Sequence, residues 1–446
     1  MAQSLKRGLY WFRHDLRLHD NPALVRFCAE VDEAMFVFVI DPRWFKSGHY
    51  QSAHMGVFRF QFLMESLHAL KLQLNDLGQD LLVVSGYPVQ VLSDLVQQRE
   101  INAIASNYHP GSYEKQQWQV MCDAFPACQL IQTSAHMLFH PDQLPFSLHS
   151  LPAHFTPFRK WVEDIVIDPC LAAPEKLPTK MSDAFADNEF DSLLAGLKNN
   201  EALAFTGGTN PGSNRLNYYL FETQKLLNYK QTRNGLLQFD DSSKLSPWLA
   251  NGCLSAKQVY HQIKLFEATV GANESTYWLY FELLWREYFQ WYLELHGSRL
   301  FKFDGIKKTK PLTSFWPERF AKWCNGDTPY PIVNACMRQL NNTGYMSNRG
   351  RQLVASCLVH ELQMDWRYGA AYFEQQLVDF DVASNWGNWQ YLAGVGADPR
   401  GHRRFDLEKQ ARTYDPDGAF VAQWQGQQGN VPLDSSDMVD WPTKWH

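Results

Sequence analysis

The C-terminal half of the sequence is rich in side chains that could carry electrons or stack on planar molecules. The chain has 446 residues, of which 16 are Trp, and 14% of all residues are aromatic. Large rings bury much apolar area, so most of them are expected in the core. Their number still leaves room for roles in electron transfer or stacking.

One carboxylate is expected among these rings. Glu282, Trp285 and Phe289 follow one another at helical spacing, which places them on the same face of a helix. Such a face suits either a core or a pocket that stacks on a planar substrate and offers it a hydrogen-bonding group.

A second segment could hold phosphate. The sequence Ser242-Ser243-Lys244-Leu245-Ser246 precedes a predicted helix, where hydroxyls and free backbone N–H groups can receive a diphosphate. An ordinary helix N-cap would use the same residue types. By contrast, residues 207–213 are glycine-rich but lack the Lys-Ser/Thr ending of a phosphate-binding loop. We predict a turn there, before a helix that starts near Asn214.

Composition limits the class of protein. Hydrophobic residues make up 45% of the chain and charged residues 20%, which supports two domains with their own cores. No apolar run has the length of a membrane span, and no apolar segment follows the charged start, so we expect neither a span nor a signal peptide. The eight cysteines never form a Cys-x-x-Cys pair, which argues against disulfides, zinc and iron–sulfur clusters. We expect a cytoplasmic monomer without a metal site.

The formal net charge of −6 does not indicate nucleic-acid binding. Basic residues gathered on one face of the protein could still bind a nucleic acid.

The elements that position these residues fall into two parts. Strands are expected at residues 9–12, 35–40, 81–84 and 101–106, and helices at 21–30, 58–77 and 89–98. This alternation predicts a doubly wound α/β domain with a parallel sheet over residues 1–140. The Gly-x-Gly-x-x-Gly of a dinucleotide-binding turn is absent after the first strand, where WFRHD (residues 11–15) stands, and this argues against NAD or FAD at that turn.

The remainder of the chain changes character. Prolines recur between residues 141 and 200, which predicts a long linker. Residues 201–446 are expected to form an all-α domain, with helices at 276–295, 332–340, 351–363 and 372–377 and a short loose tail from about residue 423.

Several motifs resemble the photolyase/cryptochrome family. YWFRHDLRLHDNPAL (residues 10–24) resembles the start of these proteins. Five segments are similar to their flavin domain: YKQTRNG (229–235), LSPWLANGCLS (245–255), FELLWREYF (281–289), GYMSNRGRQ (344–352) and DFDVASNWGNWQY (379–391). The resemblance is collinear, covers essentially the whole chain and is strong from about residue 205 to 415. The TRNG stretch, Gln352 and Tyr391 resemble the DASH branch.

The resemblance implies FAD in the helical domain, with its phosphates at Ser242, Ser243, Lys244, Leu245 and Ser246. The further implied FAD contacts are Tyr229, Glu282, Arg286, Asn348, Arg351, Asp379, Asp381 and Asn385. A buried Arg351–Asp379 pair beside the isoalloxazine ring would stabilise an anionic reduced flavin, whereas an isolated pair would be an ordinary surface salt bridge. Asn385 is implied to face flavin N5, where an amide cannot readily supply a proton, and this suits the reduced anion.

Trp389, Trp366 and Trp316 are implied as an electron-transfer chain from flavin to surface, with Trp323 as an alternative outer member. The interpretation of each Trp as a core residue stays open.

The implied substrate pocket is formed by Glu282, Trp285, Asn348, Arg349, Gln352 and Tyr391. Trp285 and Tyr391 would stack on a flipped pyrimidine dimer, and Glu282 and Asn348 would hydrogen-bond its bases. Arg233, Lys244 and Arg349 would hold phosphates despite the acidic total charge.

The resemblance implies a photolyase-type reaction. Excited reduced FAD donates an electron to a cyclobutane pyrimidine dimer, the ring opens, and the electron returns. The expected partner is single-stranded DNA that carries such dimers, because DASH-type members favour it; RNA is a further candidate. Repair of (6-4) photoproducts is not expected, since residues 347–352 contain no histidine.

A folate antenna, 5,10-methenyltetrahydrofolate, is expected in the cleft between the domains. Where the DASH branch carries an acidic residue after the 101–106 strand, this chain has His109-Pro110-Gly111. Glu114 is the candidate substitute, and a solvated glutamate at a helix start is the alternative interpretation.

Two other functions remain open. A blue-light photoreceptor with little or no repair activity, signalling through flavin photoreduction, would use the same residues. The stop soon after Trp424 favours repair, since signalling members often carry a long tail. A light-independent flavin electron carrier would leave the Glu282/Trp285 pocket unexplained.

Overall fold

Strands rich in buried apolar residues form the sheet of the N-terminal half. The computed structural model describes residues 5–181, 188–197, 203–400, 403–427 and 432–434. The strands are β1 (Arg7–Trp11), β2 (Glu33–Ile40), β3 (Leu81–Ser85), β4 (Ala103–Asn107), β5 (Gln129–Thr133) and β6 (Thr179–Lys180). They pair in parallel in the order β3-β2-β1-β4-β5, and β6 pairs with the start of β2. The strand order reverses between β1 and β4, which makes that point the topological switch of the sheet.

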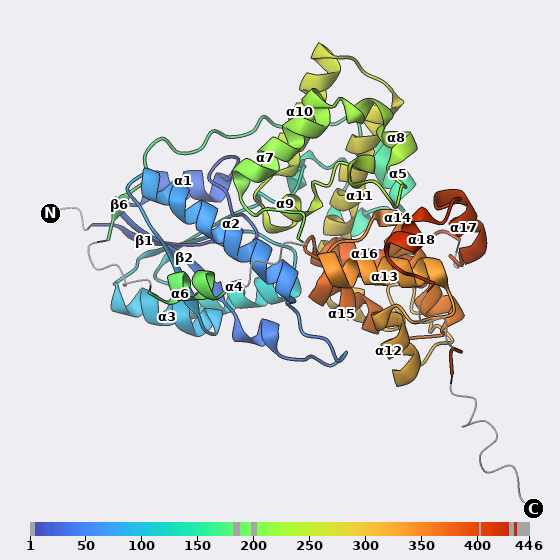
Figure 1. Ribbon diagram of the computed structural model, residues 1–446. Helices are drawn as coiled ribbons and strands as arrows, with labels where there is room; N and C mark the ends of the chain where they lie inside the picture. Colours follow the sequence, from blue (N-terminus) through green and yellow to red (C-terminus); the bar gives the residue numbers. More distant parts are fainter. Residues whose placement is uncertain (1–4, 182–187, 198–202, 401–402, 428–431, 435–446) are drawn as a thin grey trace, which may run out of the picture.

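Helices cover both faces of this sheet. Tyr10 and Phe36 pack on the side of α1 (Pro22–Glu30) and α2 (Val57–Asp76). Leu9 and Val37, each one residue away, pack on the side of α3 (Pro88–Gln98) and α4 (Ser112–Ala124). Figure 1 shows the two helix layers on opposite sides of the strands. Because parallel strands are buried on both faces, their apolar runs were readable in the sequence. The predicted doubly wound α/β domain is confirmed.

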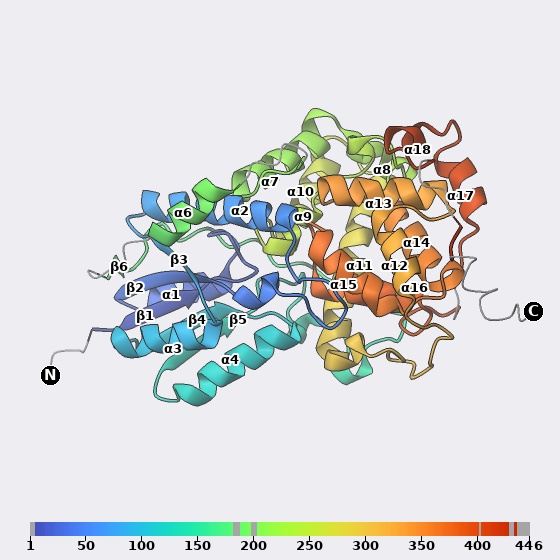
Figure 2. The same ribbon diagram turned by 60° about the horizontal axis from the view of Figure 1, so that its bottom comes forward.

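The C-terminal half is helical, as predicted. Its helices are α7 (Thr209–Asn217), α8 (Tyr229–Thr232), α9 (Ser246–Asn251), α10 (Ala256–Thr269), α11 (Glu274–His296), α12 (Pro317–Asn325), α13 (Pro331–Thr343), α14 (Asn348–Ser356), α15 (Trp366–Gln376), α16 (Val382–Leu392), α17 (Leu407–Tyr414) and α18 (Ala419–Gln423). The long helix α11 contacts α8, α10 and α16, and Figure 2 shows it inside the bundle. Among the described residues, no helix has both the length and the apolar content that a membrane span requires.

Several helix boundaries differ from the sequence-based expectation; the helix expected over residues 372–377 is α15, which already begins at Trp366. Helix α7 begins at Thr209, inside the stretch expected to be a turn, and Gly208 stands at its N-cap with φ +108°. Gly212 lies within this helix, where an added Cβ would lie 2.8 Å from the Trp248 ring. The helix expected over residues 351–363 instead begins at Asn348, where the Ser347 hydroxyl caps it by accepting from the Gly350 N–H. Its α-helical part ends at Ser356, and a single π-helical turn, Cys357–Glu361, follows directly. The tail expected from about residue 423 falls largely on residues 428–431 and 435–446, outside the described residues.

The segment expected to be a linker contacts both halves of the molecule. It contains α5 (Phe155–Val162), which packs on α11, the strand β6, and α6 (Asn188–Gly196), which contacts β3. Figure 1 shows it returning from the helical half to the sheet.

A glycine allows the two halves to approach closely. The carbonyl of Gly252, at the end of α9, accepts from the Arg17 guanidinium at 2.8 Å, and the Asn251 carbonyl accepts from the Leu16 N–H. Gly252 has φ +79°, and a Cβ there would lie 2.0 Å from the His14 carbonyl oxygen. Only glycine fits this backbone contact.

Gly252→Ala is therefore expected to lower the free energy of unfolding by about 2–4 kcal/mol, measured by thermal and denaturant unfolding. Gly78→Ala is the matched control, because Gly78 has φ +74° and nothing lies within 4 Å of an added Cβ. It isolates the backbone strain, so equal losses in the two variants would contradict a role for the close contact.

Candidate functional site

A cavity of about 500 Å³ in the helical half collects most of the residues that the sequence singled out. This volume is typical of a cofactor or ligand pocket. The residues come from distant segments that α8, α9, α11, α14 and α16 bring together. Of the expected cofactor and substrate residues, those that line it are Tyr229, Arg233, Ser242, Ser243, Lys244, Leu245, Ser246, Glu282, Trp285, Arg286, Asn348, Arg351, Gln352, Asp379, Asp381 and Tyr391.

The loop before α9 is held from its outer side. Arg215 donates to the carbonyl of Ser243 at 2.9 Å and to that of Ser242 at 3.2 Å. Lys244 has φ +59° and is buried, with its ammonium 4.7 Å from the centre of the Tyr345 ring. Leu245 stands at the N-cap, and no side chain caps α9. The loop is thus not an ordinary N-cap. Its carbonyls are directed to Arg215, while its serines and Lys244 line the cavity.

A buried ion pair lies on the cavity wall. Arg351 donates to both oxygens of Asp379 at 2.9 and 2.8 Å, and the Ser246 hydroxyl donates to Asp379 at 2.6 Å. The Asp379 side chain is only 2% exposed. Burial alone would lower the pKa of Arg351, but Asp379 and Tyr345 together outweigh it and the pKa is raised. The interpretation as a surface salt bridge is therefore wrong, and a permanent cation faces the cavity.

Asp381 caps α16 and lies between two cavities. It accepts from the Ser384 N–H at 2.7 Å and from the Gln290 amide at 2.9 Å. Burial would raise its pKa, but the hydrogen bond from His136 and the charge of Arg286 hold that pKa well below its usual value. Its carboxylate is therefore ionised and acts as an acceptor.

Asn385 is not brought into the cavity. Its amide donates to the Ala370 carbonyl of α15 at 3.0 Å. Ser384 and Asn388, on either side of it along α16, line the cavity instead. The placement of Asn385 opposite flavin N5 therefore stays a prediction. The side-chain arrangement in this structure does not support it.

An acidic and aromatic corner lies at the α11 side of the same cavity. Glu282 pairs with Arg233. Burial raises the pKa of Glu282, and Arg233 offsets only part of that effect. The Trp285 ring meets Tyr391 edge-on at 5.8 Å between ring centres. Glu282 and Trp285 share one helix face, as their spacing indicated.

Sequence reasoning missed three residues of this corner. Phe155, from the segment expected to be a linker, stacks on Trp285 with ring centres 3.8 Å apart. Arg403 lies over the Tyr391 ring at 4.2 Å. Trp278, one turn before Glu282, lies under the guanidinium of Arg233. Of these, only Trp278 carried a readable signal, namely its helical spacing.

Arg349 lies outside the cavity lining. It donates to Asn234 at 3.2 Å and to Gln410 at 3.4 Å, and lies over the Tyr414 ring. It therefore sits among polar side chains of the TRNG loop and α17.

The tryptophans of the expected electron-transfer chain differ in exposure. Trp389 is buried and packs against Gly369 of α15, where an added Cβ would lie 2.3 Å from its ring. Trp366, the first residue of α15, is fully buried. Trp316 is 48% exposed, whereas Trp323 is 0% exposed and its ring centre lies 6.2 Å from that of Trp389. Of Trp316 and Trp323, only Trp316 reaches the surface.

A second cavity of about 620 Å³ lies between the sheet and the helical half. Trp11, His14 and Glu114 line it from the sheet, and Phe380 and Trp386 from the helices. The Glu114 side chain is 19% exposed and contacts His14 Nε2 at 2.9 Å. The alternative interpretation of Glu114 as a solvated helix-start glutamate is therefore wrong.

Comparison with known proteins agrees with both halves. Residues 8–179 match the DNA photolyase family model, and residues 278–443 match the FAD binding domain of DNA photolyase. The chain is 49% identical to cryptochrome DASH of Idiomarina loihiensis over 98% of this chain and 96% of the relative. It is 48% identical to cryptochrome DASH of Vibrio parahaemolyticus over 98% and 97% of the two chains. A Synechocystis cryptochrome crystal structure, 39% identical, superposes with a TM-score of 0.89 and covers 97% of this chain and 91% of that one. The chain therefore belongs to the photolyase/cryptochrome family and, within it, to the DASH cryptochromes.

Proposed function

We propose that this protein is a light-driven photolyase-type lyase that opens cyclobutane pyrimidine dimers in single-stranded DNA, acting as a cytoplasmic monomer. One observation carries the proposal. The carboxylate of Glu282, whose side chain is 27% exposed, and the ring of Trp285 line the same cavity as the Arg351–Asp379 pair and the Ser242–Ser246 segment. A pocket built only for electron exchange with solvent would not need a substrate-sized acidic and aromatic corner beside the cofactor residues.

The cavity's donor set fits FAD. The hydroxyls and the lysine of residues 242–246, where a diphosphate would be held, line the cavity together with a paired arginine. Bound reduced FAD would supply light-driven transfer of one electron to the dimer and its return. Arg351 would hold a positive charge beside the reduced ring, and Asp379 together with Ser246 would keep Arg351 in place.

The remaining residues would hold the lesion. Trp285, kept in position by its stacking on Phe155, and Tyr391, kept in position by Arg403, present two rings at an angle of 78°. An unstacked pyrimidine dimer offers two bases for such contacts. Glu282 and Asn348 would hydrogen-bond the base edges, and Arg233 and Arg349 would hold phosphates. Extruding the dimer from a duplex costs free energy. The protein would prefer single-stranded DNA because these contacts would not offset that cost.

The direct test uses purified, chemically reduced protein under blue light, with loss of thymine dimers measured in single-stranded and duplex oligonucleotides. We expect repair of the single strand and little repair of the duplex. Repair of neither would overturn the proposal and favour the alternative, a blue-light photoreceptor that uses the same electron-transfer residues. Equal repair of both would overturn the strand preference alone.

Glu282 provides a sharper test. Because burial raises its pKa, the neutral carboxyl that donates a hydrogen bond persists to higher pH than in a solvated glutamate. We expect wild-type repair to decline as the pH rises through that pKa. Glu282→Gln should lack this decline, since its amide always donates. Glu282→Ala should lose roughly ten- to hundredfold in repair at every pH, the effect of one or two hydrogen bonds. Repair by Glu282→Ala at the wild-type rate would contradict the role.

We also propose that the second cavity holds the folate antenna. Its volume and its aromatic lining, which includes Trp11, Trp44 and Trp386, suit a planar pigment. Protein isolated with a second chromophore that absorbs at shorter wavelength than the flavin supports this assignment. Absence of folate binding after incubation with methenyltetrahydrofolate would contradict it.

A further inference from the structure

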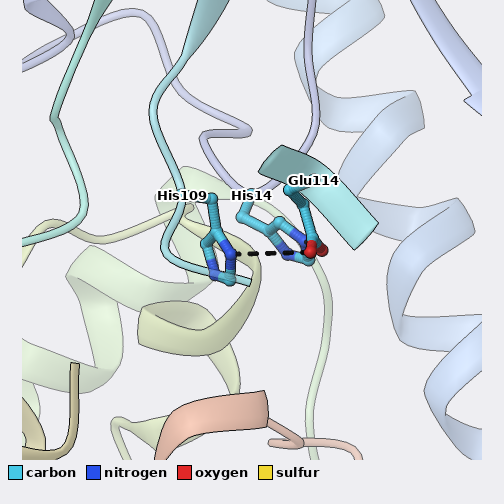
Figure 3. Close-up of side chains that lie close together, drawn as sticks. All are labelled: His14, His109 and Glu114. Carbon is cyan, nitrogen blue, oxygen red and sulfur yellow. Dashed lines mark hydrogen bonds and ion pairs between the residues drawn. The ribbon is translucent and has the colours of Figure 1, made fainter. Parts of the chain in front are cut away.

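The switch point of the sheet carries three possible metal ligands. In open α/β sheets, ligands bind outside the carboxyl ends of the strands where the strand order reverses. Here the order reverses between β1 and β4. His14 follows β1, His109 follows β4, and Glu114 lies in the first turn of α4. Figure 3 shows the three side chains pointing toward one another. No glycine-rich phosphate loop stands at this turn.

The donor atoms have the spacing of ligands to one ion. His14 Nε2 lies 2.9 Å from Glu114 Oε1, and His109 Nδ1 lies 3.9 Å from Glu114 Oε2. Two ligand atoms at about 2.1 Å from a tetrahedral ion are about 3.4 Å apart, between these two distances. One donor atom from each of the three residues lies within 4.8 Å of the others.

A glycine leaves room for the cluster. A Cβ on Gly111 would lie 2.1 Å from Glu114 Oε2 and 2.9 Å from His109 Nδ1. The backbone of Gly111 has φ −58°, which any residue adopts, so the requirement for glycine here is steric. The Gly111 N–H donates to His109 Nδ1 at 3.1 Å and orients the ring. An ion at Nδ1 would replace that hydrogen bond.

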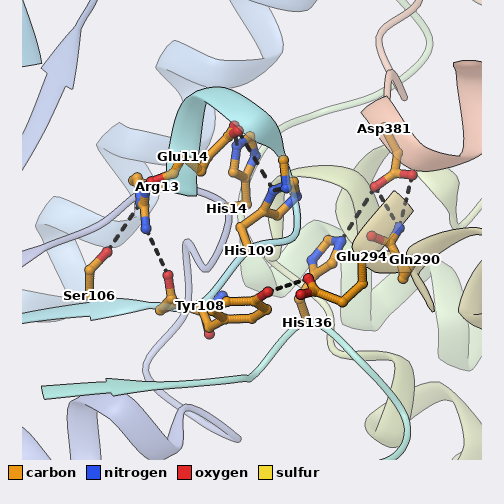
Figure 4. Close-up of polar contacts among 12 residues, drawn as sticks. Arg13, His14, Ser106, Tyr108, His109, Glu114, His136, Gln290, Glu294 and Asp381 are labelled. Carbon is orange, nitrogen blue, oxygen red and sulfur yellow. Dashed lines mark hydrogen bonds and ion pairs between the residues drawn. The ribbon is translucent and has the colours of Figure 1, made fainter. Parts of the chain in front are cut away.

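The neighbouring positive charge is directed elsewhere. Arg13 donates to Ser106 Oγ (Figure 4). It also donates to the backbone carbonyls of Asn107 and Glu114, and it lies over Trp11. These hydrogen bonds of Arg13 go to groups other than the three ligand atoms.

A second group of possible metal ligands lies on the other side of His109, but this group has an arginine directly beside it. His136 and Asp381 also lie close to His109. The Arg286 guanidinium, however, lies 2.9 Å from His136 Nε2, and Gln290 donates to both oxygens of Asp381. A permanent cation therefore stands where a metal would have to bind.

We propose that His14, His109 and Glu114 bind one divalent transition-metal ion of the Zn²⁺ or Co²⁺ type. Two imidazoles and one carboxylate form a ligand set that zinc uses when it keeps a further position open. His14 and Glu114 line the second cavity, so the open position faces it, and a water molecule or an anionic group in that cavity would complete the coordination. This site is independent of the proposed DNA repair. The sequence did not predict this metal site, because its cysteine spacing indicates no metal and His14 lies far from His109 and Glu114 in the chain.

The test is Zn²⁺ binding to the full-length, flavin-loaded protein after chelator treatment, measured by isothermal titration calorimetry, which the flavin colour does not disturb. The wild type is expected to bind one equivalent. His14→Gln, Glu114→Gln and Gly111→Ala are each expected to weaken binding at least about tenfold, because even indirect disturbance of a metal site has effects of that size. Excess Zn²⁺ should also raise the Tm of the wild type.

His140→Gln is the matched control. His140 lies beside Asp142 at 3.2 Å, but both side chains are exposed, at 61% and 90%. This variant should bind Zn²⁺ as the wild type does. Flavin absorbance and Tm without metal report folding, and His14→Gln is the least disruptive change because the His14 side chain is 31% exposed. No binding to the wild type, or equal binding by the wild type and His14→Gln, would overturn the proposal.

Discussion

Trp389→Phe is expected to slow photoreduction of the bound flavin at least about tenfold, since a rise of about 1.4 kcal/mol in the barrier has that effect. Trp389 lies on α16, which also contributes Ser384, Asn388 and Tyr391 to the cavity. Phenylalanine keeps most of the packing against Gly369 but is far harder to oxidise than an indole. Repair by enzyme that is reduced beforehand should change little, because Trp389 is not part of the acidic and aromatic corner.

The measurements are the rate of flavin reduction under steady blue light with an external electron donor, and dimer repair by chemically reduced protein. Trp161→Phe is the control, since Trp161 is 51% exposed and lies on α5. Equal loss of both activities in Trp389→Phe would contradict its assignment to the electron route. If the exposed Trp316 is the outer member of the electron-transfer chain, Trp316→Phe should slow photoreduction and Trp323→Phe should not. The reverse result would make Trp323 the outer member.

Arg351→Met is expected to lower the free energy of unfolding by about 2–3 kcal/mol and to reduce the amount of FAD that copurifies. Removing one partner of a buried ion pair costs about 3–5 kcal/mol, and the 24% exposure of the Arg351 side chain lowers that figure. Asp379 would keep the hydrogen bond from the Ser246 hydroxyl but lose its paired cation. Its uncompensated negative charge would then face the reduced flavin.

Thermal unfolding and the ratio of flavin to protein absorbance measure these effects. Arg351→Lys should recover part of both, because it restores the charge but not the two-point contact. Arg404→Met removes a pair with Glu361 of similar length, 2.9 Å, but the Arg404 side chain is 67% exposed, so little change is expected. If Arg351→Met kept its FAD and its Tm, the pair would have no role in cofactor binding.

Much of the fold could be predicted from local pattern. The run MFVFVI in β2 is buried on both faces, and such continuous apolar runs indicate parallel strands. Edge strand β5, QLIQT, has only two adjacent apolar residues among polar ones and was not singled out. Helix α4 was also not singled out; of its thirteen residues only Trp118 and Met121 are buried. Both elements were implied only by the general alternation of strands and helices.

The fold class, the family and most residues of the main cavity could be predicted from the sequence, because short motifs such as LSPWLANG and GYMSNRGRQ keep their residues together in the chain. Tertiary structure alone decided the contacts between distant segments. Phe155 reaches Trp285, Asn385 turns to the Ala370 carbonyl, and His14 meets His109 and Glu114. The physical reason is that local periodicity fixes which face of an element is buried, whereas strand order and helix packing fix which elements meet. The tryptophans show both effects. Their number is visible in the sequence, but packing decides which of them reaches solvent.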